Sequence, residues 1–156
     1  MKVVLASDHR GYRLKESIKK LLSELGLHFL DVGTFTPDSV DYPDFGIAAA
    51  EKVSQGEYER GILICGSGVG MCVVANKFPG IRAALVRDVY TAEMSRKHND
   101  SNVLALGADL VSEPLAREIA ARWLQTKFEG GRHLRRIEKI TALEARLRIP
   151  PEDRHT

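Results

Sequence analysis

The sequence predicts an α/β fold built on a parallel sheet of about five strands. Short apolar runs alternate with segments whose apolar residues recur at three- and four-residue steps, roughly every 25 to 30 residues. Near the middle of the chain, residues 61–70 read Gly-Ile-Leu-Ile-Cys-Gly-Ser-Gly-Val-Gly. The continuous apolar run Ile62–Ile64 is typical of a strand that helices cover on both faces. Connections between parallel strands of this kind are expected to be right-handed.

Five apolar runs have the length and composition of buried strands. The predicted strands cover residues 3–6, 29–32, 62–64, 83–86 and 103–106. Polar turns follow the first two: Ser7–Gly11 after one, and a stretch rich in Thr, Pro, Asp and Ser over 33–43 after the other.

Six segments have helical periodicity or follow a clear helix start. The predicted helices cover residues 14–25, 47–55, 71–76, 89–97, 115–128 and 132–148. Gly26 and Gly56 suit the position just after a helix, and Asp88 is an N-cap residue. Gly130 and Gly131 separate the last two helices.

The composition narrows the class of protein. The 156 residues fit one domain, 1–156, with a polar tail from about residue 149. The net charge of +2, with both signs mixed, predicts neither nucleic acid nor membrane as a partner. No apolar stretch approaches the ~20 residues of a membrane span, and no secretory signal peptide is expected. Cys65 and Cys72 lack metal-ligand and disulfide-scaffold spacing, which favours a reducing cytoplasm.

The glycine-rich turn at 66–70 is the first candidate site. Strand, glycine loop and helix together point several backbone N–H groups at one spot, where negative charge can be held. Cys65 ends the strand, and a helix N-terminus favours the thiolate, so Cys65 is a candidate base or nucleophile. The alternative is a tight turn with a structural cysteine. Neither the dinucleotide fingerprint nor the P-loop fits, because Met71 stands where each motif requires glycine or lysine.

Loops that follow parallel strands gather at one edge of the sheet. Asp8 and His9 follow the first strand, and we expect them near Cys65 and Tyr42, although spacing alone favours a helix N-cap and a surface histidine. His98 precedes a strand and therefore belongs to the opposite edge, where it could also be structural. It reaches Cys65 only from a second subunit, so a functional His98 predicts a dimer with a shared site.

The last predicted helix carries a basic face. Arg132 and Arg136 are four residues apart and share that face. Arginine binds phosphate bidentately, although the pattern by itself favours a solvated basic surface. Interrupting glutamates and the lack of aromatics argue against nucleic acid. No two histidines have metal-binding spacing, so no metal is expected.

Several motifs in one order resemble a known family. They are Ser7–His9, Val40–Asp44, Ile64–Gly70, Ala75–Lys77, Gly80–Ala83, Ser95–Asp100 and Glu129–His133. The chain, as far as about Leu143, resembles type B ribose-5-phosphate isomerases, a family that includes the galactose-6-phosphate isomerase subunits. The resemblance implies a Rossmann-like three-layer sandwich and aldose–ketose isomerisation of a sugar phosphate without cofactor. It also implies a homodimer or tetramer with shared sites, in which the C-terminal helix of one subunit extends to its partner.

The resemblance also implies roles for individual residues. Cys65 matches the base, and Met71 occupies the position where some relatives use a glutamate instead. His98 matches the acid that opens the sugar ring, and Ser67 helps the loop hold the enediolate oxygen. The matched substrate contacts are Asp8, His9, Tyr42, Gly66, Gly68, Val69, Gly70 and Asn99, and the matched phosphate contacts are His9, Arg132 and Arg136.

One position departs from the family pattern. Many relatives have Gly-x-Arg after the last strand and use that arginine for phosphate, whereas this chain has Gly107-Ala108-Asp109. The remaining basic residues must then suffice, with Arg87 as one candidate substitute, or the substrate differs. Ribose 5-phosphate is the first expectation. The alternatives are galactose 6-phosphate, allose 6-phosphate or a tetrose phosphate, and a non-catalytic flavodoxin-like binding module.

Overall fold

The computed structural model describes residues 1–149, so residues 150–156 of the expected polar tail lie outside the described residues. The strands are β1 (Lys2–Ser7), β2 (His28–Asp31), β3 (Arg60–Cys65), β4 (Ala83–Leu85) and β5 (Val103–Gly107). They form one parallel sheet in the order β2-β1-β3-β5-β4. The predicted five-stranded parallel sheet is confirmed.

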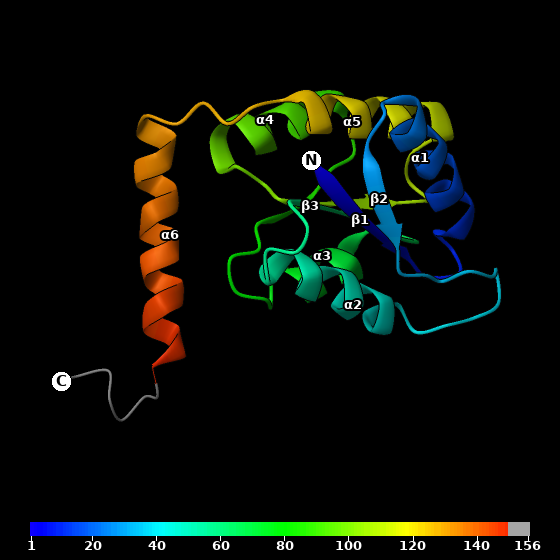
Figure 1. Cartoon of the computed structure of the whole chain (residues 1–156), viewed down its shortest axis with the longest axis horizontal. Coiled ribbons are helices and arrows are strands. Elements are labelled where there is room, and N and C mark those ends of the chain that lie inside the picture. Colours follow the sequence, from blue (N-terminus) through cyan, green and yellow to red (C-terminus); the bar gives the residue numbers. More distant parts are fainter. Residues whose placement is uncertain (150–156) are drawn as a thin grey trace.

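Helices cover both faces of the sheet. They are α1 (Tyr12–Glu24), α2 (Tyr42–Ser54), α3 (Val69–Ala75), α4 (Val89–Asn99), α5 (Glu113–Gln125) and α6 (Arg132–Arg148). Figure 1 shows α1, α4 and α5 on one face and α2 with α3 on the other, which is a Rossmann-like three-layer arrangement. Helix α6 stands apart from the layers as a projecting arm.

Each face of the sheet has its own apolar core. Side chains alternate between faces along a strand, so Ile62 and Ile64 pack under α1, α4 and α5. Leu63 and Cys65 instead pack under α2 and α3. Trp123 of α5 is fully buried in the first core, and its indole N–H donates to Ser101 Oγ at 2.8 Å. Because Cys65 is the last residue of β3, the sheet fixes the position of its backbone.

Four helices, α1, α2, α3 and α5, begin two to five residues earlier than the sequence predicts. Helix α2 begins at Tyr42 and not near residue 47, because extended Asp41 precedes it and Pro43 fits the first turn. Helix α3 begins at Val69 because Gly68, in the left-handed region at φ 77°, turns the chain directly into the helix. Helix α5 ends at Gln125, three residues before the expected end.

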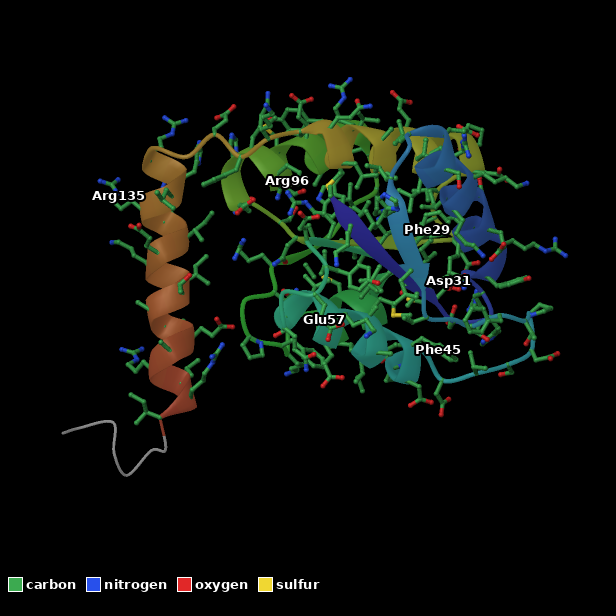
Figure 2. The ribbon with its side chains drawn as sticks, viewed as in Figure 1. Phe29, Asp31, Phe45, Glu57, Arg96 and Arg135 are labelled. Carbon is green, nitrogen blue, oxygen red and sulfur yellow. The ribbon has the colours of Figure 1, made fainter. Side chains whose placement is uncertain are left out.

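Helix α6 has the bounds that the sequence predicts. Figure 2 shows Arg135 on the side of α6 that faces away from the body of the molecule. The opposite side, with Ile137 and Leu143, lines a groove of about 690 Å³ together with Pro79 and Arg82. Among the described residues, no helix combines the length and apolarity needed to cross a bilayer.

Candidate functional site

The turns after β1 and β3 meet at one edge of the sheet. The Asp8 N–H donates to Ile64 O at 3.2 Å, which joins the end of β1 to the end of β3. The ring of Tyr42 lies against the glycine loop, since a Cβ on Gly70 would be 2.6 Å from it. We call these residues the strand-edge group. The group consists of Asp8, His9, Tyr42, Cys65, Gly66, Ser67, Gly68, Val69 and Gly70.

Cys65 lies at the centre of the strand-edge group. The Gly68 N–H donates to Cys65 Sγ at 3.2 Å, which fixes the position of the sulfur beside the glycine loop. Cys65 is only 5% exposed, whereas Ser67 and Val69 of the same loop are exposed to solvent. Ser67 Oγ also accepts the Val69 N–H at 3.3 Å. The loop therefore places the Cys65 sulfur beside the Ser67 hydroxyl and the backbone N–H groups at the start of α3.

The second cysteine is in a different environment. Burial raises the pKa of Cys72, and its Sγ lies 3.5 Å from Ala83 O. A thiol that stays protonated is a poor base. Cys72 therefore provides a natural comparison for Cys65.

His9 is held in one tautomer by the loop that follows β2. The Val40 N–H donates to His9 Nδ1 at 3.2 Å, so the ring proton of a neutral His9 is on Nε2. Asp8 Oδ1 accepts the Gly11 N–H at 2.9 Å, so Asp8 does cap the turn, as the alternative interpretation proposed. Both side chains are thus fixed before any ligand arrives.

A buried lysine supports this arrangement, and the sequence analysis missed it. Lys15 Nζ lies 2.5 Å from Asp31 Oδ1 and 2.6 Å from Thr34 O, so it ties the start of the loop to α1. Burial lowers the pKa of Lys15, although the hydrogen bond to Asp31 opposes that shift. The available signal was a lysine beside Leu14 on the apolar face of an amphipathic helix.

A second set of predicted residues gathers around the end of α4 and the start of α6. The rings of His98 and His133 stack with centroids 4.2 Å apart and planes 12° apart. Glu129 Oε2 lies 3.7 Å from His133 Nε2. Burial lowers the pKa of His133, and neighbouring His98 and Arg132 lower it further. We call this the helix group: His98, Asn99, Glu129, Arg132, His133 and Arg136.

The two groups lie at opposite edges of the sheet within one chain. Cys65 pairs with Gly107 at the end of β5, whereas His98 and Asn99 precede the first residue of that strand, Val103. A single chain therefore does not bring Cys65 and His98 together. This separation agrees with the sequence, which places His98 at the opposite edge of the sheet.

The helix group contains donors of the kind that bind metals. The ligand atoms of His98, Glu129 and His133 lie within 4.8 Å of one another, which the sequence spacing did not reveal. Lys97 Nζ, however, lies 3.9 Å from Glu129, and Arg132 adjoins the cluster. These cations, with the positive end of α6, favour an anion over a metal cation.

Asp109, which stands where many relatives have arginine, faces a basic residue from the turn after β1. Asp109 forms an ion pair with Arg10, which follows His9 in the turn after β1. Arg87, the substitute considered from the sequence, follows β4, which is the edge strand two places from β3. Arg10, and not Arg87, is therefore the arginine that pairs with Asp109.

The fold and the sequence are both similar to those of known proteins. The Ribose/Galactose Isomerase family matches residues 3–140. The chain is 46% identical to ribose-5-phosphate isomerase B of Escherichia coli over 93% of this chain and 97% of that protein. A structure of Clostridium thermocellum ribose-5-phosphate isomerase B superposes with a TM-score of 0.92 at 50% identity, covering 94% of this chain and 99% of that one.

A structure of ribose-5-phosphate isomerase B from Mycoplasma genitalium, with bound ribulose 5-phosphate, gives a TM-score of 0.89 at 42% identity. It covers 92% of this chain and 96% of that chain. The protein is an aldose–ketose isomerase. It belongs to the ribose/galactose isomerase family.

Proposed function

We propose that this enzyme interconverts ribose 5-phosphate and ribulose 5-phosphate through an enediolate. The relatives named above support a sugar phosphate as substrate. The observation that carries the proposal is Cys65 Sγ, held at the end of β3 by the Gly68 N–H in a loop whose Ser67 and Val69 are exposed. Free thiols at Cys65 and Cys72 are consistent with action in the cytoplasm.

Cys65 acts as the base in this proposal. Its thiolate removes the proton from sugar carbon 2 and returns it to carbon 1, while the oxygens at both carbons exchange one proton. A carbon acid beside a carbonyl needs both a placed base and stabilisation of the developing oxyanion. Ser67 and the N–H groups of the loop from Gly66 to Gly70 provide that stabilisation. The residues proposed here supply the proton transfer without a metal or an organic cofactor.

The remaining site residues bind and open the sugar. His98 donates a proton to the ring oxygen as the bond between that oxygen and carbon 1 breaks, and the hydroxyl on carbon 1 releases a proton as it becomes the carbonyl. Asp8, Tyr42 and Asn99 bind sugar hydroxyls. The phosphate-binding residues are His9, Arg132 and Arg136.

The proposed site is completed by a second copy of the chain. Cys65 and His98 lie at opposite edges of one sheet, so the helix group must come from the partner. Helix α6 exposes Ile140 (54%) and Leu143 (44%), and its groove of about 690 Å³ is open to solvent. A second copy that covers this apolar surface would bring its helix group to the strand-edge group.

A substrate panel tests the proposal. The purified enzyme is assayed with aldose phosphates of four to six carbons, and kcat/KM is expected to be highest for ribose 5-phosphate. A higher value for galactose 6-phosphate, allose 6-phosphate or a tetrose phosphate would reassign the substrate. Thermal stabilisation by nucleotides, with no turnover of any sugar, would instead indicate a flavodoxin-like binding module.

The matched variants Cys65→Ala and Cys72→Ala test the base. Cys65→Ala should lower kcat by ~10³-fold or more, because proton transfer by a placed group contributes about 10²–10⁴-fold. Its dissociation constant for ribose 5-phosphate should stay within about tenfold, since the base acts on the chemical step. Cys72→Ala should retain kcat. Near-normal kcat in Cys65→Ala would refute the role of Cys65.

A further inference from the structure

An ion pair spans the first residue of the glycine loop. Arg10 and Asp109 come from the turns after β1 and β5, and their side chains meet over Gly66. A Cβ on Gly66 would lie 2.9 Å from Arg10 Nε and 2.9 Å from Asp109 Oδ2. The pair therefore lies directly beside the residue that follows Cys65.

Both members of the pair are tied to the strand-edge group through the backbone. The Asp109 N–H donates to Gly66 O at 3.0 Å, and the Ala108 N–H donates to Cys65 O at 2.9 Å. On the other side, Arg10 lies between His9 and Gly11, and the Gly11 N–H is fixed by Asp8 Oδ1 at 2.9 Å. The turn that carries both His9 and Arg10 is thus fixed at Gly11.

The charges explain why the two side chains occur together. An unpaired carboxylate at Asp109 would repel a phosphate dianion beside the loop, whereas the ion pair cancels that charge. Arg10 donates to Asp109 through Nη2, and guanidinium has five N–H donors in all. The side chain of Arg10 is 58% exposed, so further donors are accessible to a ligand.

We propose that Arg10 is a phosphate-binding residue of this enzyme and that Asp109 orients its guanidinium toward the substrate. This inference rests on the proposed sugar-phosphate isomerase function. It assigns the chain a phosphate contact within the same subunit as Cys65, separate from Arg132 and Arg136. Arg10 would contact the substrate, and Asp109 would act through Arg10 as a positioning residue.

Steady-state kinetics of Arg10→Ala test the proposal. KM for ribose 5-phosphate should rise about tenfold while kcat stays within about threefold, because a hydrogen bond to a charged group is lost from binding alone. The inhibition constant of inorganic phosphate should rise by a similar factor. Arg117→Ala is the control, since Arg117 forms a comparable ion pair with Glu24 between α1 and α5, and both constants should stay unchanged.

The double variant tests the role of Asp109. In the Arg10→Ala background the carboxylate is unpaired, so adding Asp109→Asn should lower KM again by about threefold. Arg10→Lys should recover part of the loss, because lysine keeps the charge without the planar fork. Equal effects of Asp109→Asn in both backgrounds would show that Asp109 does not act through Arg10.

Failure of this inference is distinct from failure of the proposed function. Turnover of ribose 5-phosphate by the wild type, with unchanged KM and unchanged phosphate inhibition in Arg10→Ala, overturns the inference alone. Absence of turnover in the wild type overturns the proposed function. In that case, calorimetric titration with inorganic phosphate still tests Arg10, and equal affinity in wild type and Arg10→Ala overturns its role.

Discussion

The strand-edge group and the helix group are held in place in different ways. The strand-edge group lies at the end of β3, in the turns that follow β1 and β3, and at the starts of α2 and α3. Backbone contacts such as Asp8 N–H to Ile64 O fix it to the sheet. The helix group lies on the last turn of α4, on the loop that holds Glu129, and on α6, which projects from the layers (Figure 1). His98 and His133 are fixed there by stacking of side chains.

The difference shows which parts of the proposed chemistry each region supplies. The strand-edge group contributes a sulfur and backbone donors, which need exact placement and receive it from the sheet. In the proposed mechanism, the helix group contributes imidazoles and guanidinium groups, which have longer reach and would act on proton and phosphate. Because the two groups lie at opposite edges of one sheet, the proposed site needs two chains.

Mixing two inactive variants gives the largest expected effect. Cys65→Ala and His98→Ala are each expected to be nearly inactive. After the two are unfolded together and refolded, mixed dimers contain one site with both wild-type residues, so activity should return to about a quarter of the wild-type value for random pairing. The measurement is kcat of the refolded mixture.

Each variant refolded alone serves as the control and should stay inactive. Full lack of recovery in a mixture that contains mixed dimers by native mass spectrometry would mean that Cys65 and His98 act within one chain or not together. A monomeric mass for the wild type would also contradict the shared site.

Gly68→Ala tests how strictly the backbone shapes the strand-edge group. Gly68 has φ 77°, and a Cβ there would lie 2.6 Å from Leu85 Cδ1 and 2.8 Å from the backbone of Leu106. We expect about 3 kcal/mol loss of unfolding free energy from strain and overpacking, with a large fall in kcat.

Gly80→Ala is the matched control, because Gly80 has φ 73° with no atom within 4 Å of the added Cβ. Its cost should be about 1 kcal/mol, without a fall in kcat. Denaturant unfolding measures both losses. Similar losses in the two variants would show that packing around the loop is unimportant.

Arg136→Ala tests the helix group on its cationic side. KM for ribose 5-phosphate should rise about tenfold with kcat little changed, since a phosphate contact contributes to binding. Arg135→Ala is the control, because Arg135 lies on the side of α6 that faces away from the body (Figure 2). An unchanged KM in Arg136→Ala would support the solvated-surface interpretation.

The smallest expected effect is the pH dependence of stability that His133 contributes. Because burial lowers the pKa of His133 in the folded state, the unfolded chain takes up the extra proton first as the pH falls below about 6.5. The stability that neutral His133 contributes is therefore fully present above about pH 6.5 and is lost as the pH falls toward the pKa of His133 in the folded state.

Thermal unfolding at about pH 8 and about pH 5 measures this effect. The fall in Tm on acidification should be smaller in His133→Gln than in the wild type. His28→Gln, at an exposed position in β2, should show the wild-type fall. An equal fall in His133→Gln would remove His133 from the acid response.

Much of the fold was predictable because strand and helix patterns are local. The apolar run Ile62–Ile64 and the periodic leucines of α1 reflect burial that the sheet then enforces. The starts of α2 and α3 were harder to place. Tyr42 and Val69 begin their helices because of extended Asp41 and left-handed Gly68, which apolar periodicity does not report.

The candidate site was predictable where one turn carries the chemistry, as it does at Cys65. Partnerships between distant residues were not predictable. The pair of Arg10 with Asp109 and the stack of His98 on His133 depend on which turns meet in space. Lys15 was missed for the same reason, because its partner Asp31 lies on another element.

Trp123, the single tryptophan of the chain, gives the molecule an intrinsic optical probe. Its indole is fully buried and donates a hydrogen bond to Ser101. Ser101 lies just before β5, at the same edge of the sheet as the helix group. Fluorescence should therefore report unfolding around α4 and α5, and should respond little when a ligand occupies only the glycine loop at the far edge.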